Sequence, residues 1–261
     1  MDMQELSLKE QTELVTVRSA ADIRGAAEAF RDIAWAEVGL RVILSDNIAN
    51  KKPLTDENGA ILASEVFGWN APGERWWTDP RLALTSQLPR ACRYESEPFW
   101  VNAAGFHVHQ PNPYLDAIDL LHFEKRSFCK ASIVVPVHLP FCQIGIVCFV
   151  TADPGRADLS REFEQHADGL ALLSHRFIAG CAKALRTRQW LPEDCQLSKR
   201  EVECLRWASF GKTDREISMI LKRSHATVRF HIQNAGEKLD AVNRSQTIFK
   251  AAQLGYLGSA A

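Results

Sequence analysis

Apolar residues recur with two different spacings along the chain up to about residue 188. Helical spacing over Ser19–Ala36, Pro113–Arg126 and Ser160–Arg188 predicts three amphipathic helices. Compact apolar runs predict strands, which we place at residues 40–45, 99–103, 132–139 and 145–151. This mixture of helices and strands indicates an α+β fold for this part of the chain.

The connections between these elements indicate how two of the strands pair. The strands at 132–139 and 145–151 flank Pro140-Phe-Cys-Gln, so we expect them to form an antiparallel hairpin. Residues 47–60 have the composition of a loop, with a turn at Asn58-Gly59. The long helix over Ser160–Arg188 has one apolar face, which can pack on its own sheet or against a second copy of the chain.

The segment after residue 196 carries a series of helix start signals. Ser198 and Glu201 have the spacing of a capping box, and Thr213 and Glu216 repeat it. Ser224 has the residue type and position of a third N-cap. Three short helices at this spacing, the last two joined by a tight turn, are typical of a helix-turn-helix.

The third of these helices has a core face and a polar outer face that carries one aromatic ring. A helical wheel at about 100° per residue gathers the core positions Val228, Ile232, Ala235 and Leu239. Arg229, Phe230 and Gln233 lie opposite, where Arg can bond guanine, Gln can bond adenine and Phe can pack on a thymine methyl group. We predict these three as base contacts. Phosphate contacts are expected from Thr213, Arg223, Ser224, Thr227 and Lys238.

The charge of the chain is distributed unevenly. The formal net charge is −1, yet residues 195–261 hold 11 Lys and Arg against 6 Asp and Glu, a net charge of +5. Residues 1–194 hold the remaining 20 basic and 26 acidic residues, a net charge of −6. A basic domain that follows an acidic one is typical of a nucleic-acid-binding domain attached to another domain.

Leu197–Leu239 resembles the LuxR-type (GerE-like) helix-turn-helix, reading LSKREVECLRWASFGKTDREISMIL and then SHATVRFHIQNAGEKL. The matching positions are Glu201, Leu205, Gly211, Glu216-Ile217, Thr227-Val228, His231 and Lys238-Leu239. The resemblance implies an all-α domain of four helices. It also implies that the fourth helix, Arg244–Leu254, forms a dimer contact and that the dimer binds a two-fold symmetric site in double-stranded DNA.

The preceding part of the chain is similar to the acyl-homoserine-lactone-binding (autoinducer-binding) domain of quorum-sensing regulators. Asp79-Pro80, Pro98-Phe99-Trp100 and Ser132-Ile-Val-Val-Pro136 carry this similarity. It implies an α-β-α sandwich with an antiparallel sheet and a pocket between the sheet and one helical layer.

A lactone ligand would need specific partners in such a pocket. Asp79 could accept its amide N–H, and indole N–H groups could donate to its carbonyls. Apolar walls would hold the acyl chain. The candidate ligand residues are Trp69, Trp76, Asp79, Trp100, Val134 and Phe149. The alternative is that the Trp residues are core and that Asp79 caps a turn before Pro80.

The sequence departs from that family at several ligand positions. Asn70 and Val66 stand where Tyr and Trp are usual, Ser132 replaces a Gly, and Cys148 or Phe149 replaces a Ser or Thr. Each headgroup atom left without a partner costs about 1–3 kcal/mol. Three hypotheses therefore stay open: the domain binds an acyl-homoserine lactone, it binds a different small ligand, or the protein acts without a ligand.

Several other classes of protein find no support in the sequence. It contains no G-x-S-x-G, no Gly-rich phosphate loop and no H-E-x-x-H, so we expect neither an enzyme nor a bound cofactor. The apolar runs are shorter than the roughly 20 residues of a membrane span, and the polar N-terminus does not read as a signal peptide. The seven cysteines form no C-x-x-C pair, and His107 and His109 lack metal-site spacing, so we expect buried reduced thiols and no metal.

These features predict a cytoplasmic transcription regulator of the LuxR type, with RNA polymerase as a further partner. Its expected parts are a sensory and dimerisation domain at 1–186, a linker at 187–197 and a DNA-binding domain at 198–261. It would act as a homodimer or as a heterodimer with another LuxR-type protein, in response to a lactone or another small signal. The alternative is a LuxR-like interaction subunit that acts without a ligand through a partner regulator.

Overall fold

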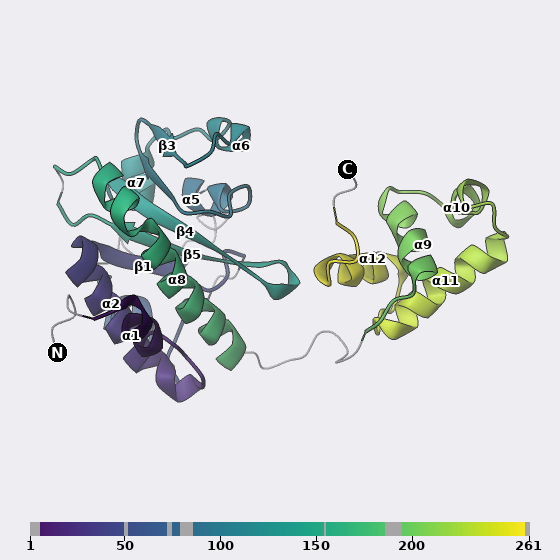
Figure 1. The fold of residues 1–261 in the computed structure, drawn as a ribbon, viewed down its shortest axis with the longest axis horizontal. Coiled ribbons are helices and arrows are strands. Elements are labelled where there is room, and N and C mark those ends of the chain that lie inside the picture. Colours follow the sequence, from purple (N-terminus) through teal and green to yellow (C-terminus); the bar gives the residue numbers. More distant parts are fainter. Residues whose placement is uncertain are drawn as a thin grey trace. The chain divides into compact units, whose positions relative to one another are not determined.

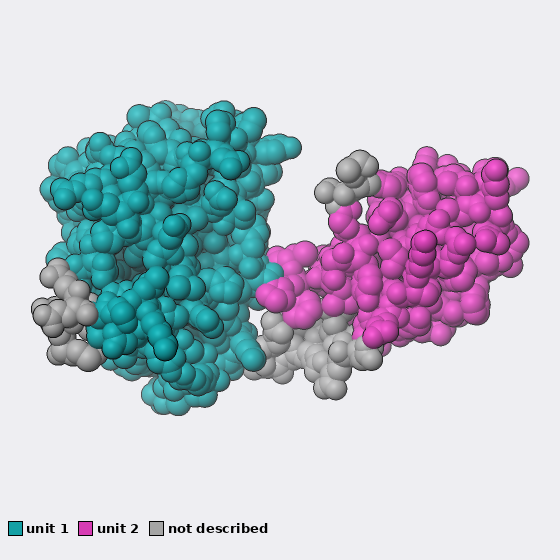
Figure 2. All heavy atoms as spheres, viewed as in Figure 1, with its two compact units in different colours: residues 1–139, 143–186 teal, residues 140–142, 187–261 magenta. Residues whose placement is uncertain are grey.

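The computed structural model describes residues 6–49, 52–71, 75–78, 86–153, 155–185 and 195–258. The chain divides into two compact units (Figures 1 and 2). Unit 1 comprises residues 1–139 and 143–186, and unit 2 comprises residues 140–142 and 187–261. Most of the predicted linker, residues 187–194, lies outside the described residues.

Unit 1 is built on a five-stranded antiparallel sheet in the order β1-β5-β4-β2-β3. The strands are β1 (Arg41–Ser45), β2 (Phe99–Asn102), β3 (Gly105–His107), β4 (Ala131–Leu139) and β5 (Gln143–Val150). The predicted hairpin is confirmed, since β4 and β5 pair from Ser132↔Val150 to Leu139↔Gln143 around the short helix η5 (Pro140–Cys142). Strand β3 is not among the four predicted strand ranges, because three residues are too few to show a period.

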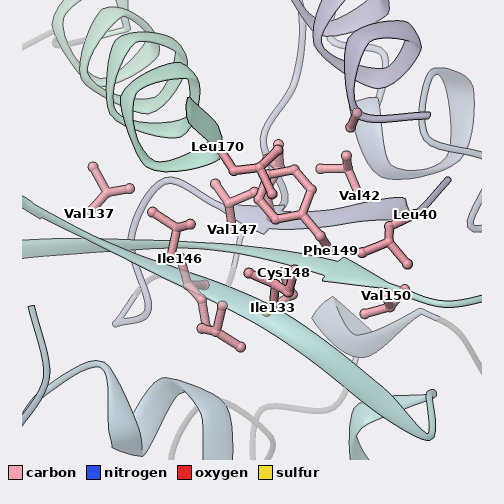
Figure 3. Packing of buried hydrophobic residues seen from close by; sticks show 14 of the residues in the cluster. Leu40, Val42, Ile133, Val137, Ile146, Val147, Cys148, Phe149, Val150 and Leu170 are labelled. Carbon is pink, nitrogen blue, oxygen red and sulfur yellow. The ribbon is translucent and has the colours of Figure 1, made fainter. Parts of the chain in front are cut away.

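Three helices form a layer that packs on one face of the sheet (Figure 1). They are α1 (Leu8–Leu14), α2 (Ile23–Val38, preceded by η2 at Ala20–Asp22) and α8 (Ser160–Ala184). Phe30 of α2 meets Phe149 of β5 edge to face at 5.9 Å and lies 5.5 Å from Phe177 of α8. Figure 3 shows Phe149 beside Leu170 of α8. The long helix α8 therefore packs its apolar face on its own sheet.

Besides η5, further short helices lie in the described parts of the connections between the strands. They are α3 (Leu62–Glu65), η4 (Trp76–Thr78), α5 (Gln87–Ala91), α6 (Pro113–Asp116) and α7 (Phe123–Ser127). The prediction of one helix over Pro113–Arg126 is wrong, because α6 and α7 are separate. The Asp119 carboxylate accepts the Leu121 N–H at 2.8 Å, and His122 has the left-handed φ of 58°, so the helix cannot continue.

Over residues 195–258, unit 2 contains four helices, which are α9 (Lys199–Ser209), α10 (Asp214–Ile220), α11 (His225–Lys238) and α12 (Arg244–Gln253). Both capping boxes are confirmed, with Ser198 and Glu201 at the start of α9 and Thr213 and Glu216 at the start of α10. The core face of α11 is buried at the four expected positions, Val228, Ile232, Ala235 and Leu239. On α10, Ile217 is buried, whereas 40% of the surface of Ile220 is exposed.

An ion pair between the exposed Lys238 and the buried Glu201 connects α9 to the end of α11. Lys238 Nζ donates to Glu201 Oε2 at 2.9 Å, and the Glu201 side chain is only 4% exposed. The Ser198 N–H donates to the same carboxylate at 2.7 Å. Burial raises the pKa of Glu201, but the Lys238 and Ser198 hydrogen bonds outweigh it, and the pKa lies below its ordinary value. Glu201 is therefore ionised at neutral pH.

We expect Gly180→Ala to destabilise unit 1. A Cβ atom there would lie 2.7 Å from the Val17 carbonyl oxygen and 2.8 Å from the Val17 Cβ. This overlap should cost about 1–3 kcal/mol of unfolding free energy. Gly169→Ala is the matched control on the same helix, because its Cβ would meet only Leu8 Cδ1 at 3.8 Å, and it should gain about 0.5–1 kcal/mol of helix propensity. Thermal unfolding of the full chain measures the stability of both variants. Equal stabilisation by the two changes would contradict the close contact between Gly180 and Val17.

We expect Lys238→Met to weaken unit 2 in a pH-dependent way. Because the pKa of Glu201 is lowered in the folded state, its ionised form contributes stability above the unfolded pKa of about 4.3, and this is lost as the pH falls through the folded pKa. The loss at pH 7 should be about 1 kcal/mol, since Lys238 is partly exposed.

Hydrogen exchange of the unit 2 amides across a pH series measures this effect. The variant and the parent should converge in acid, whereas Lys199→Met, an exposed change at the start of α9, should leave stability nearly unaltered. An equal loss at every pH would argue for a packing role of Lys238 alone.

Candidate nucleic-acid interface and pocket

The outer face of α11 carries the three residues predicted to contact bases. The helix starts at Ser224, whose Oγ accepts the Thr227 N–H at 3.0 Å. From that start the helical period turns Val228 inward and leaves Arg229, Phe230 and Gln233 exposed to solvent. The Phe230 ring is 59% exposed, although a ring of this size normally contributes to a core. An apolar ring between a cation and an amide on one open helix face suits contact with base edges.

The polar side chains on this face of α11 can donate hydrogen bonds. The Gln233 amide donates to Glu237 Oε1 at 3.2 Å, a bond between two exposed groups that water or a base can replace. Arg229 and Gln233 are four residues apart, so their side chains project from the same side of the helix. Phe230 also meets the His231 ring at 5.8 Å.

The five predicted phosphate contacts have different surroundings. Thr213 and Ser224 are N-caps, and their hydroxyls already bond Glu216 and Thr227. Hydrogen bonds from Thr213 hold the pKa of Glu216 below its ordinary value, which places a negative charge beside that helix start. Lys238 is engaged with Glu201. Arg223 is exposed, so it is the residue of this set best placed to reach a phosphate.

Helix α12 holds the end of α11 in place, a role that the sequence did not predict. The Lys250 side chain is buried, and its Nζ donates to the carbonyl oxygens of Leu239 at 2.9 Å and Asp240 at 2.6 Å. An ammonium group at a helix C-terminus satisfies carbonyls that have no partner within the helix. Phe249 on the same helix is 59% exposed, which leaves an apolar group on the surface expected to pair in a dimer.

Unit 1 contains an open pocket beside the sheet. Its empty volume is about 1190 Å³, with the space open to solvent included. The lining comes from β1, β5, the loop after β1, and the short helical segments around α3, η4, α5 and α7. Ile43, Ser45, Ile146 and Cys148 point into it, since paired residues share one face of a sheet.

Two of the predicted ligand tryptophans have different roles. Trp76 lines the pocket, and it meets Trp77, another lining residue, edge to face at 4.8 Å. Trp69 is buried, and its indole N–H donates to the Val42 carbonyl at 2.7 Å. The Arg41 guanidinium lies 3.7 Å from the centre of the Trp69 ring. That indole N–H is therefore occupied by the protein backbone.

Three other predicted ligand residues, Trp100, Val134 and Phe149, do not line the pocket. Phe149 and Trp100 both pair with Ile133, so they lie on the sheet face opposite Cys148. Phe149 packs on Phe30, and Trp100 stacks on His107 at 3.7 Å. Val134 pairs with Cys148 and shares its face, yet it is buried away from the pocket. Asp79 lies outside the described residues.

The sequence did not identify most of the pocket. Lys52, Arg126 and Gln87 line it, and none of the three is among the predicted ligand residues. No local pattern marks them, because each reaches the pocket only through the packing of short helices on the sheet.

Among the described residues, no group of three or more His, Cys, Asp or Glu side chains is arranged to hold a metal ion. His109 stacks instead on Phe163 at 4.8 Å. None of the described helices is both long and apolar enough to cross a bilayer.

Comparison with known proteins identifies the family of the C-terminal unit. Residues 195–251 match the family model described as bacterial regulatory proteins, luxR family. The matched segment contains all of α9, α10 and α11 and most of α12. This is a family of regulatory proteins, not of enzymes.

Individual relatives are similar over part of the chain. The transcriptional activator protein VanR of Vibrio anguillarum is 36% identical over 130 residues, which is 49% of this chain and 52% of VanR. The transcriptional activator protein LuxR of Aliivibrio fischeri is 35% identical over 122 residues, 46% of this chain and 47% of that protein. The chain thus aligns with about half the length of the curated relatives it matches.

Among solved structures, Escherichia coli SdiA is similar to this chain, with 23% sequence identity and a TM-score of 0.39. The match covers 70% of this chain and 72% of the SdiA chain. For the C-terminal part, the four helices with N-cap side chains and the match over residues 195–251 both indicate the same family. Unit 2 of this chain is a helix-turn-helix domain of the luxR family of bacterial regulatory proteins.

Proposed function

We propose that this protein is a dimeric, sequence-specific DNA-binding transcription regulator, with unit 2 as the reader and unit 1 as a sensory domain. One observation carries the proposal, the exposed trio Arg229, Phe230 and Gln233 on the outer face of a capped α11. An α-helix fits the major groove, where each base pair presents a distinct pattern of donors and acceptors.

Each residue of the trio has a chemical task in this proposal. Arg229 donates to guanine O6 and N7, and Gln233 bonds adenine N6 and N7. Phe230 covers a thymine methyl group, which removes its exposed ring from water. Arg223 would contact the phosphate backbone and set the position of the helix.

Unit 1 supports a sensory role through its pocket, which is lined mainly by apolar side chains with a few polar ones. Pairing of two copies through α12 is supported by the exposed Phe249. A regulator-like subunit that pairs with a different LuxR-type chain would use the same surface, and sedimentation of the purified chain alone and with such a chain separates the two.

Selection from a pool of random-sequence DNA tests the proposed function. We expect enrichment of one site with two-fold symmetry, bound by two copies of the chain. Binding with no sequence preference at physiological salt would contradict a sequence-specific regulator and leave only electrostatic attraction.

We expect Arg229→Ala to lose about 1–3 kcal/mol of binding free energy on the selected site and to relax the preference at one base position in each half-site. Fluorescence anisotropy with a panel of single-base changes measures both effects. Arg200→Ala is the control, because Arg200 is exposed on α9 and paired with Glu203. If Arg229→Ala left the affinity and the base preference unaltered, α11 would not be the recognition helix.

We expect Arg223→Ala to weaken binding equally on specific and random DNA. Loss of one phosphate contact should reduce the slope of log K against log salt concentration by about 1. A salt titration of the parent and the variant measures the slope. A change of base preference without a change of slope would assign Arg223 to the bases instead.

A further inference from the structure

We infer that Arg244 is a positioning residue for base recognition, because it holds the start of α10 while Lys250, on the same helix α12, holds the end of α11. The inference rests on the proposed role of α11 as the recognition helix and adds a determinant of specificity that lies outside the exposed trio. The groups involved all lie within residues 195–258, which are described without a gap.

Arg244 is the first residue of α12, and its side chain reaches the start of α10. Its Nη2 donates to the Lys212 carbonyl at 2.6 Å, and its Nη1 donates to the Asp214 carboxylate. Lys212 and Asp214 lie on either side of Thr213, the N-cap of α10. The two bonds therefore attach α12 to the first turn of α10 and to the backbone just before it. The planar guanidinium presents both N–H groups in one fixed geometry, which a lysine ammonium does not reproduce.

The opposite end of α12 contacts α11. Lys250 lies in the last turn of α12, and its buried ammonium donates to the carbonyl oxygens of Leu239 and Asp240. Between its two ends α12 packs closely on α11, because a Cβ atom at Gly236 would lie 3.1 Å from Thr247 Oγ1. Helix α12 is thus bonded to α10 through its first residue and to α11 through its last turn.

The direct connection between α10 and α11 is a single tight turn. Lys222 has a left-handed φ of 51° there, and the Arg223 N–H donates to the Ser218 carbonyl at 2.9 Å. Such a turn sets the chain direction locally, but a small angular error at the turn grows along the 14 residues of α11. Bonds from Arg229 and Gln233 to base edges require placement within roughly 0.5 Å. Attachment of the start of α10 and the end of α11 to one helix limits this error.

The ion pair of Arg244 allows a positioning role to be separated from a simple effect of charge. The side chains of Arg244 and Asp214 are 35% and 22% exposed, and their charges cancel within unit 2. Replacing Asp214 removes a negative charge from a DNA-binding domain, which by itself strengthens the attraction to any DNA. The same replacement removes one of the two attachments of α10, which weakens the sequence-specific complex. The two roles therefore predict opposite results for a change at Asp214.

We expect Arg244→Lys in the full chain to bind the selected DNA site roughly fivefold more weakly, because α11 then occupies its binding orientation for a smaller fraction of the time. Discrimination between the selected site and its single-base variants should shrink as well. Affinity for random-sequence DNA should stay the same, since the positive charge is kept. Asp214→Ala should show the same loss of discrimination. Anisotropy titrations on selected, single-base-changed and random DNA measure these ratios.

Arg200 provides the matched control. It is also an ion-paired arginine of unit 2, but its partner Glu203 lies on its own helix α9, so Arg200→Lys should leave affinity and discrimination unchanged. Hydrogen exchange of the free protein gives a second measurement, which needs no DNA. Arg244→Lys should lower the protection of the first hydrogen-bonded amide of α10, the Ile217 N–H that donates to the Thr213 carbonyl. Protection of the α9 amides should not change.

A purely structural role of Arg244 gives a different result. If Arg244→Lys only lowered the folded fraction, all affinities would fall by one factor and the discrimination ratios would not change, which would overturn the inference. Unchanged binding by Arg244→Lys, or tighter binding of the selected site by Asp214→Ala, would overturn it too.

Failure of the parent chain to select any DNA site would instead contradict the proposed function. In that case, loss of α10 protection in Arg244→Lys would still support the attachment of α10 by Arg244, and unaltered protection would overturn it.

Discussion

Strand β5 lies between two layers, and its side chains alternate between them. Phe149 enters the core with Phe30 and Phe177, while Cys148 and Ile146 face the pocket. A register shift of one residue against β4 or β1 would exchange these two sets. The hairpin pairing from Ser132↔Val150 to Leu139↔Gln143 therefore fixes both the packing of α8 and the composition of the pocket walls.

Unit 2 is organised by local hydrogen bonds at the helix ends. Three successive helices begin at Ser198, Thr213 and Ser224, each of which caps its own first turn. Because every cap sets where its helix starts, it also sets which side chains of that helix face the core. The exposed face of α11 follows from the cap at Ser224 and the helical period alone.

The contrast between the two units explains what the sequence could and could not predict. The caps and the outer face of α11 depend on residues within a few positions of one another, so the pattern revealed them. The pocket depends on the order of strands, and Phe149 and Trp100 were placed in it because their sheet face could not be known. The break between α6 and α7 was missed for a similar reason. Apolar spacing carries no sign of the left-handed backbone at His122.

Lys250 has a consequence for how a pair of these domains would measure DNA. Its ammonium joins the last carbonyls of α11 to α12, so the angle between these two helices is fixed inside one unit. In the dimer proposed above, with two copies paired through α12, that angle would set the distance between their two α11 helices. The half-site separation that such a pair recognises would then be determined by contacts inside unit 2.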